Sequence, residues 1–270
     1  MRSRSLVTLI AVPLLALLSV YRVQWPLSVV VVSAGTWGLL ELYALARSRG
    51  GRPQPIIGAL TGGAVLCCGF LPSGAQWLWP ALALGTMTAL SAGVIRRGAE
   101  GGLRDFAITV GGVLYVSLLF AFVLALRRDF GGRILMAVWL GNCGGDIGAF
   151  LVGRRWGRRK LMPRLSPNKT VEGALAGLIV CVAAFAASHA CFGTGLPGWA
   201  VVPMALLIAC AGVLGDLCES LLKRDAQVKD SGARIPGHGG MLDAVDSLLF
   251  AVPAAYFATL VLAYFGMVNA

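Results

Sequence analysis

Residues 199–222, WAVVPMALLIACAGVLGDLCESLL, decide the fold class of this chain. The run exceeds the ~20 residues that an α-helix needs to cross a bilayer, and no charged residue occurs in it before Asp216. The rest of the chain is similar, with 57% hydrophobic residues, 13% charged residues and a mean hydropathy of +0.79. Soluble domains carry far more charge. The sequence therefore predicts an integral membrane protein.

Apolar runs of this kind recur along the chain. Nine of them are candidate membrane spans, at residues 6–20, 25–46, 55–71, 76–95, 106–126, 134–152, 171–191, 199–222 and 248–267. The first run follows two arginines, as in a signal peptide, but no small-residue cleavage site follows it, so we interpret it as a retained span. The predicted fold class is an all-α polytopic bundle of about nine transmembrane helices.

We expect one membrane domain over residues 1–270. Within it, residues 1–130 would supply N-terminal helices that pack together and contact lipid. Residues 131–270 would supply further helices and the cytoplasmic loops.

Basic residues are distributed unevenly between the loops. With the N-terminus inside, 19 Lys and Arg face the cytoplasm and four face outside, which is the asymmetry that the positive-inside rule describes. The same distribution explains the formal net charge of +11 without a nucleic-acid partner. We therefore expect no nucleic acid, a location in the bacterial inner (cytoplasmic) membrane, and functional loops that face the cytoplasm.

One region concentrates the charge. Residues 215–247, GDLCESLLKRDAQVKDSGARIPGHGGMLDAVDS, contain ten charged residues and His238, and they hold six of the twelve acids of the chain. Carboxylates at the edge of a bilayer are costly unless a cation compensates them. The i, i+3, i+4 and i+7 spacing places four polar side chains on one helix face, namely Asp216, Glu219, Ser220 and Lys223. Asp243 and Asp246 repeat the i, i+3 spacing.

A hard metal ion is the simplest compensating cation for these acids. Mg²⁺ binds one or two carboxylates together with water and phosphate oxygens, so we interpret Asp216 and Asp243 as metal ligands. We expect Asp246 and Glu219 to lie behind them. Lys223 would reach a phosphate as a point charge. The alternative is that the acids only form ion pairs at the helix end, with Lys223, Arg224 or Arg234.

A glycine-rich turn lies between the two groups of acids. The sequence Pro236-Gly237-His238-Gly239-Gly240 has too many glycines for regular structure, and exposed backbone amides in such turns bind anions. The alternative is a plain tight turn. His238 either acts as an acid toward pyrophosphate or hydrogen-bonds the turn.

The whole region resembles the signature of the phosphatidate cytidylyltransferases, also called CDP-diacylglycerol synthases. That signature reads S-x-x-K-R, then K-D, then P-G-H-G-G, and it closes with D-R-x-D. It is matched here by Ser220, Lys223, Arg224, Lys229, Asp230, Pro236, Gly237, His238, Gly239, Gly240, Asp243 and Asp246. Ala244 stands where the family has arginine.

A second family-like element lies upstream of the first. It comprises Asp146, then Gly153-Arg154, then Ser166-Pro167-Asn168-Lys169-Thr170, then Glu172-Gly173. The resemblance covers roughly the C-terminal half of the chain, from about Gly141 onward. The first half is similar to the family only in being hydrophobic.

The resemblance implies transfer of the cytidylyl group of CTP to phosphatidate, which gives CDP-diacylglycerol and pyrophosphate. It also implies a homodimer among membrane lipids, with dimer contacts from residues 1–130 and catalytic helices in residues 131–270. One or two Mg²⁺ ions are implied at Asp216 and Asp243. The implied catalytic residues are Asp216, Lys223, Asp243 and Asp246. The implied substrate-binding residues are Asp146, Ser166, Lys169, Thr170, Ser220, Arg224, Lys229, Asp230, His238, Gly239 and Gly240.

Some polar positions have a local interpretation. Thr170 is placed to cap the helix that begins after it, and Glu172 suits the first turn of that helix. Asp146 is an acid inside the sixth span, for which we expect a polar cavity. Glu41 in the second span has no partner in the sequence, and we assign it no role. Most glycines outside the motifs are attributed to helix packing.

Two other functions stay open at the level of the sequence. A CTP-dependent lipid kinase of the polyprenol type would release CDP rather than pyrophosphate. An ion or phosphate-lipid transporter would also carry intramembrane acids such as Glu41, Asp146 and Asp216. The sequence lacks the paired interrupted apolar segments that are typical of such transporters.

Overall fold

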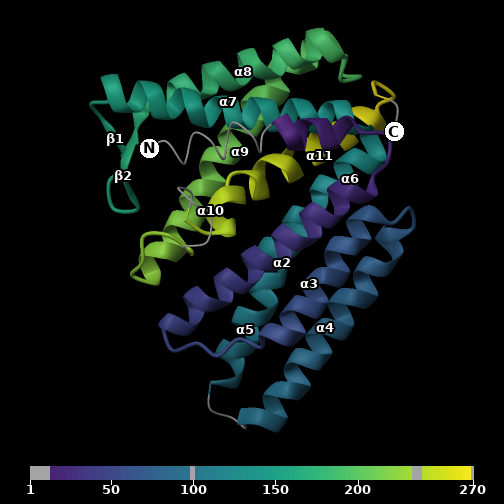
Figure 1. The fold of residues 1–270 in the computed structure, drawn as a ribbon, viewed down its shortest axis with the longest axis vertical. Coiled ribbons are helices and arrows are strands. Elements are labelled where there is room, and N and C mark those ends of the chain that lie inside the picture. Colours follow the sequence, from purple (N-terminus) through teal and green to yellow (C-terminus); the bar gives the residue numbers. More distant parts are fainter. Residues whose placement is uncertain (1–12, 98–100, 233–238, 269–270) are drawn as a thin grey trace. The chain divides into compact units, whose positions relative to one another are not determined.

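The computed structural model describes residues 13–97, 101–232 and 239–268. The described elements are α2 (Trp25–Ser48), α3 (Pro55–Phe70), α4 (Gly74–Arg97), α5 (Gly102–Gly112), η1 (Val113–Leu118), α6 (Leu119–Phe130), α7 (Gly132–Trp156), β1 (Lys160–Met162), β2 (Ser166–Thr170), α8 (Val171–Phe192), α9 (Gly198–Asp225), α10 (Met241–Val245) and α11 (Leu248–Tyr264). Figure 1 shows these helices and the small two-stranded sheet.

Most of the predicted spans coincide with long helices. Among the described residues, seven helical stretches are long and apolar enough to cross a membrane: Trp25–Ser48, Gly74–Ile95, Gly102–Phe130, Gly132–Trp156, Val171–Phe192, Gly198–Asp225 and Met241–Tyr264. The predicted span at 55–71 corresponds to the shorter apolar helix α3. The predicted span at 6–20 lies partly outside the described residues, and its end at 13–20 is helical. The prediction of an all-α polytopic membrane protein is confirmed.

The chain forms two compact units. Unit 1 comprises Met1–Gln24, as far as it is described, together with Leu126–Leu221 and Asp246–Ala270. Unit 2 comprises Trp25–Ala125 and Leu222–Val245. Two boundaries between the units fall inside helices, one within α6 and one within α9. Each of these helices therefore contributes residues to both units.

Unit 1 is organised around the long contact of α7 with α8, which lie side by side in Figure 1. Small residues allow this approach: a β-carbon on Gly177 would lie 2.9 Å from the Gly145 carbonyl oxygen, and one on Gly173 would lie 2.8 Å from the Ala149 carbonyl oxygen. Close backbone approach of this kind holds helices together in lipid, where hydrophobic burial gives little drive. The attribution of glycines to helix packing is confirmed for this pair.

Unit 2 packs α2 against α3, η1 and α10. Its core includes the fully buried side chains of Tyr43, Leu39 and Leu66. The Tyr43 hydroxyl donates to the Thr109 carbonyl oxygen at 2.7 Å, so the one polar atom of this large side chain is satisfied inside the core. Leu242 on α10 is also fully buried, which fixes α10 on α2.

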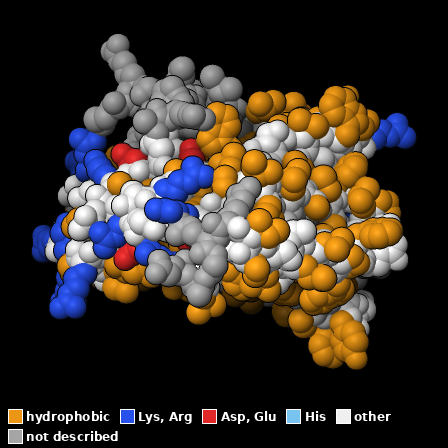
Figure 2. All heavy atoms as spheres, turned by 90° about the horizontal axis from the view of Figure 1, so that it is seen from below, with side chains coloured by type: hydrophobic (Ala, Val, Ile, Leu, Met, Phe, Trp, Pro, Cys, Tyr) orange, Lys and Arg blue, Asp and Glu red, His pale blue; other side chains and the backbone are white. Residues whose placement is uncertain are grey.

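The helices expose many apolar side chains. Figure 2 shows hydrophobic side chains over a wide part of the visible face, and most of the visible Lys and Arg side chains lie outside that part. Trp79 is 73% exposed and Ile179 is 70% exposed, although each belongs to a long apolar helix. Such exposure is unfavourable in water and favourable in lipid, which fits an integral membrane protein.

A β-hairpin between α7 and α8 was not predicted. Strands β1 and β2 pair antiparallel, with Lys160 opposite Thr170 and Met162 opposite Ser166. The hairpin ends where α8 begins, because the Thr170 hydroxyl accepts a hydrogen bond from the Gly173 amide at 3.2 Å and so caps the helix. The predicted cap is therefore confirmed. The segment just before β1 is also held at the start of α8, because the Glu172 carboxylate accepts a hydrogen bond from the Arg158 amide at 3.0 Å.

Candidate active site

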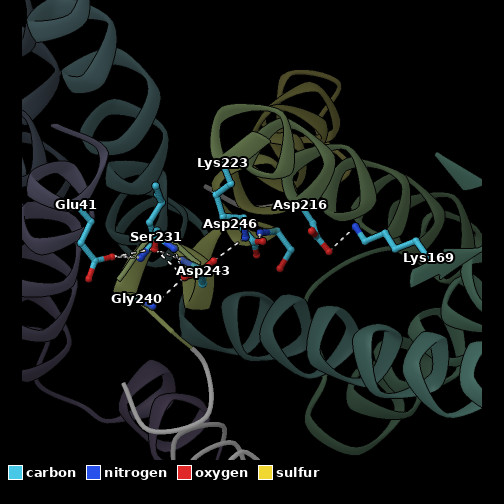
Figure 3. A network of polar contacts seen from close by, with 10 residues as sticks. Glu41, Lys169, Asp216, Lys223, Ser231, Gly240, Asp243 and Asp246 are labelled. Atoms are coloured by element: carbon cyan, nitrogen blue, oxygen red, sulfur yellow. Dashed lines mark hydrogen bonds and ion pairs between the residues drawn. The ribbon is translucent and has the colours of Figure 1, made fainter. Parts of the chain in front are cut away.

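A first group of polar residues belongs to unit 1, and we call it the α7 cluster. Its members are Asn142, Asp146, Lys169, Asp216, Asp246 and Ser247. The Lys169 ammonium group forms an ion pair with Oδ2 of Asp216, as Figure 3 shows. Asp246 lies within electrostatic reach of Asp146, Asp216 and Glu219. Unit 1 therefore gathers several of the predicted acids and supplies one lysine to them.

The α7 cluster is held together by an amide and a hydroxyl. Asn142 Nδ2 donates to Ser247 Oγ at 2.9 Å and lies 3.5 Å from Asp146 Oδ2. The Ser247 amide donates to Asp246 Oδ1 at 2.6 Å. Asn142 and Asp146 also line a small cavity between α7, α8 and α9. The rest of its lining is small or apolar, such as Ala149, Leu178 and Val213, so the polar cavity expected at Asp146 stays a prediction.

A second group of polar residues belongs to unit 2, and we call it the α10 cluster. Its members are Glu41, Lys223, Ser231, Gly240 and Asp243. Lys223 Nζ donates to Asp243 Oδ1 at 2.6 Å. Asp243 Oδ2 accepts three hydrogen bonds, from the Ser231 amide at 2.8 Å, the Ser231 hydroxyl at 2.7 Å and the Gly240 amide at 2.8 Å. The Asp243 side chain is only 7% exposed, so these four donors replace its hydration.

Glu41 anchors the α10 cluster to α2. Its Oε2 accepts from the Leu242 amide at 2.9 Å and lies 3.2 Å from Ser231 Oγ. Glu41 is 8% exposed. Figure 3 shows its carboxyl group directed at Ser231 and Gly240. The acid to which the sequence assigned no role is thus in direct contact with the cluster that holds Asp243.

Helix α9 carries the predicted row of polar side chains. Asp216, Glu219, Ser220 and Lys223 all lie within it, with Glu219 and Ser220 buried. The lysine that meets Asp216 is Lys169 rather than Lys223, which pairs with Asp243. The predicted use of both Asp216 and Asp243 as metal ligands stays a prediction, because these two residues belong to different units.

The other predicted substrate-binding residues have different surroundings. Arg224 is exposed near the end of α9, and Lys229 and Asp230 are exposed in the segment that follows. Ser166 is half-buried at the start of β2. Gly240 and Asp146 belong to the α10 and α7 clusters, respectively. His238 and most of the glycine-rich turn lie outside the described residues.

Gly239 has a conformation that requires glycine. Its φ is +94°, and a β-carbon on it would lie 2.7 Å from Oδ2 of Asp243. Other residues are strained at such a φ, and the close approach leaves no room for a side chain. The glycine therefore allows the backbone to reach Asp243.

Comparison with known proteins identifies the family of this chain. The sequence profile of the Cytidylyltransferase family matches residues 2–262 of the chain. The chain belongs to this family. The match includes the first half of the chain, whose only visible likeness to the family in the sequence is its hydrophobic character.

Two relatives of this family member are named phosphatidate cytidylyltransferase. The one from Bacillus subtilis (strain 168) is 37% identical over 146 residues, which are 53% of this chain and 54% of the relative. The one from Staphylococcus haemolyticus (strain JCSC1435) is 40% identical over 152 residues, or 55% of this chain and 57% of the relative. The chain thus spans about half the length of the curated relatives it matches.

Four residues of the α7 and α10 clusters were not predicted from the sequence as part of a site: Glu41, Asn142, Ser231 and Ser247. Asn142 precedes Asp146 by four residues, so helical spacing alone would have placed the two on one face. Ser231 and Ser247 each follow an acid directly, which is a weak signal. Glu41 carries no local signal, because its partners are 190 and 201 residues away in the chain.

Proposed function

We propose that this protein transfers the cytidylyl group of CTP to phosphatidate and releases pyrophosphate. The observation that carries the proposal is the pairing of each predicted metal aspartate with a lysine of the family signatures, Asp216 with Lys169 and Asp243 with Lys223. Family membership and the names of the two relatives support it. Location in a membrane supports a lipid as one substrate.

The reaction has simple chemical requirements. An oxygen of the phosphatidate phosphate attacks the α-phosphorus of CTP. The bond from that phosphorus to the oxygen between the α- and β-phosphorus atoms breaks, and pyrophosphate leaves with the electron pair. A phosphate monoester is already anionic near neutral pH and needs little help from a general base. Catalysis then depends on positioning and on neutralising the charge of several phosphates. Lys169 and Lys223 are suited to this task because each is a compact cation.

The two aspartates differ in how well they suit a metal ion. Mg²⁺ prefers oxygen ligands and takes one or two carboxylates beside water and phosphate oxygens. The Asp216 side chain is 33% exposed and forms its ion pair with Lys169 through Oδ2, so it fits this role. Asp243 fits only with Lys223 turned away from its Oδ1, because Oδ2 already accepts three hydrogen bonds. The described residues contain no group of three or more His, Cys, Asp and Glu arranged for a metal.

On this basis we propose Asp216 and Asp243 as the Mg²⁺ ligands, with Asp246 as a supporting acid. The metal would supply charge neutralisation at the phosphates of CTP. Asp146, Ser166, Thr170, Ser220, Arg224, Lys229, Asp230, His238, Gly239 and Gly240 are proposed as contacts to the substrates. We further propose a cytoplasmic active site in the bacterial inner membrane, and a homodimer.

The position of the transferred label tests the function. The purified protein is incubated with phosphatidate, Mg²⁺ and CTP that is radiolabelled at either the α- or the γ-phosphate. Cytidylyl transfer moves the α-label into lipid and leaves the γ-label in pyrophosphate. A lipid kinase would move the γ-label into lipid instead. We expect only the α-label in lipid, and no transfer after chelation of divalent metal. Transfer of the γ-label, or α-transfer that survives chelation, would contradict the proposal.

A further inference from the structure

Glu41 is a buried carboxylate to which the proposed reaction gives no role. It lies in the C-terminal part of α2, and its carboxyl group approaches the segment that carries Asp243 at two points, Ser231 and Leu242. Both contacts are made by the same oxygen, Oε2. The other oxygen, Oε1, is buried and has no hydrogen-bond partner in the part of the chain that the structure describes. A buried carboxylate is costly, so its retention on an apolar helix calls for a function.

The Ser231 hydroxyl links Glu41 to Asp243. Ser231 Oγ lies 2.7 Å from Asp243 Oδ2 and 3.2 Å from Glu41 Oε2. A serine hydroxyl has one hydrogen, so two carboxyl groups compete for a single donor. The shorter contact is to Asp243, which therefore receives the stronger hydrogen bond. A change at Glu41 would alter the orientation of this hydroxyl, and through it the set of donors around Asp243.

Glu41 also fixes the backbone around Asp243. The Leu242 amide, directly before Asp243, donates to Glu41 Oε2 at 2.9 Å. Two glycines let the backbone pass close to the carboxyl group: a β-carbon on Gly232 would lie 2.8 Å from Oε1, and one on Gly240 would collide with Oε2. The Gly240 amide in turn donates to Asp243 Oδ2. The acid thus holds the two stretches of chain whose backbone amides donate to Asp243, at Ser231 and Gly240.

We infer that Glu41 is a positioning residue for the reaction: it acts through Ser231 and the Leu242 amide to fix the Asp243 carboxylate. This inference rests on the proposed function in one respect only, namely that Asp243 takes part in cytidylyl transfer. The hydrogen bonds themselves do not depend on that assignment.

The inference is tested by substitution and by two independent readouts. Glu41→Gln preserves the shape of the side chain and one acceptor oxygen, whereas Glu41→Ala removes both contacts. We expect kcat to fall about tenfold in the first variant and about 100-fold in the second, while KM for phosphatidate stays within about twofold. Hydrogen exchange of the peptide around Leu242, followed by mass spectrometry, should become faster in both variants.

A double-mutant cycle separates positioning from general destabilisation. If Glu41 acts through Ser231, the combined Glu41→Ala and Ser231→Ala variant should lose little more than the worse single variant, because the two residues serve one contact. Asp105→Asn is the matched control, since Asp105 is another buried acid of unit 2 and accepts from the Arg52 amide at 2.7 Å. This control should leave kcat and the exchange near Leu242 within about twofold of the parent.

Two further outcomes separate this inference from the proposed function. If the parent protein transfers no cytidylyl group but hydrogen exchange near Leu242 is faster in Glu41→Ala, the proposed function is contradicted. The contact between Glu41 and the Leu242 amide is then still supported. A parent that is active, combined with Glu41 variants of parental kcat, would overturn the inference whatever the exchange shows. Strictly additive effects of Glu41→Ala and Ser231→Ala would overturn it as well.

Discussion

The ammonium group of Lys223, near the end of α9, donates to Oδ1 of Asp243 on α10 at 2.6 Å. Both side chains are largely buried, with 13% and 7% of their surfaces exposed, respectively. The Lys169 and Asp216 pair is more open, at 26% and 33%. The two signature ion pairs therefore differ in how much each lysine contributes to stability and how easily each can turn to a substrate.

Removal of Lys223 should destabilise the protein more than removal of Lys169. Lys223→Met leaves the buried Asp243 carboxylate without its cation, and breaking a buried pair in this way costs about 3–5 kcal/mol. Lys169→Met leaves a partly exposed carboxylate, for which the cost is about 1 kcal/mol or less. Thermal unfolding in one detergent would measure both. The double variant of Lys223→Met with Asp243→Asn should recover much of the loss, and equal melting temperatures for the two single variants would contradict this account.

Substitution of either proposed metal ligand should remove activity while the protein still folds, although Asp243→Asn also lowers stability because it breaks the buried pair with Lys223. Asp216→Asn and Asp243→Asn each replace a charged oxygen by an amide of the same shape, so we expect turnover to fall by about 100-fold or more. Asp129→Asn is a suitable control, because Asp129 pairs with Arg128 and accepts from the Tyr256 hydroxyl at 3.0 Å. Cytidylyl transfer would be measured at several Mg²⁺ concentrations. Near-parental rates with unchanged Mg²⁺ dependence would remove both residues from the metal site.

Much of this fold follows from local sequence patterns. Apolar runs longer than a bilayer crossing predict α7, α8 and α9, because in lipid the backbone must satisfy its own hydrogen bonds. The cap at Thr170 and the polar row on α9 follow from residue spacing within one element. These features depend only on neighbours a few positions apart, which a single sequence displays directly.

The remaining features depend on contacts that sequence spacing does not encode. Glu41 meets Ser231 across 190 residues, and no pattern within α2 signals that partner. The β-hairpin at 160–170 contains arginine, lysine and proline, a composition typical of a loop, and its pairing is short. The π-helical segment η1 lies in an apolar run for which the sequence predicts one continuous α-helix. Each of these is a tertiary effect that local propensity does not determine.

A side chain at position 239 should disturb the site beyond the cost of its backbone conformation. Gly239→Ala combines a φ of +94° with a contact to Asp243, so it should reduce turnover about tenfold or more. Gly131 has a nearly identical φ of +91° with nothing within 4 Å of its β-carbon position. Gly131→Ala therefore isolates the conformational cost, about 1–3 kcal/mol. Equal effects of the two variants on stability and on turnover would argue against a role for the approach to Asp243.

The loops on the two ends of α8 should face opposite sides of the membrane. We predict that the hairpin before α8 lies in the cytoplasm and that the loop after it lies outside, because the basic residues are concentrated in the former. Single cysteines at the exposed positions Arg158 and Gly198, in a background without the seven native cysteines, allow a test with an impermeant thiol reagent. Only the cysteine at 198 should react in intact cells. Reaction of both would contradict the predicted topology.

The last prediction concerns Ala244, which occupies the position of an arginine in the family signature. Ala244 is exposed on α10, next to Asp243, so a longer side chain has room there. An arginine would place a planar, bidentate donor beside the acids, and this donor suits phosphate better than the point charge of lysine. Ala244→Arg should therefore lower KM for CTP by about threefold or more, and Ala244→Lys should lower it less. Arg234, which would otherwise supply the missing charge, lies outside the described residues. If Ala244→Arg is slower than the parent and binds CTP more weakly, the site has been built around the alanine, and a second substitution at Arg234 would then show whether that residue supplies the charge.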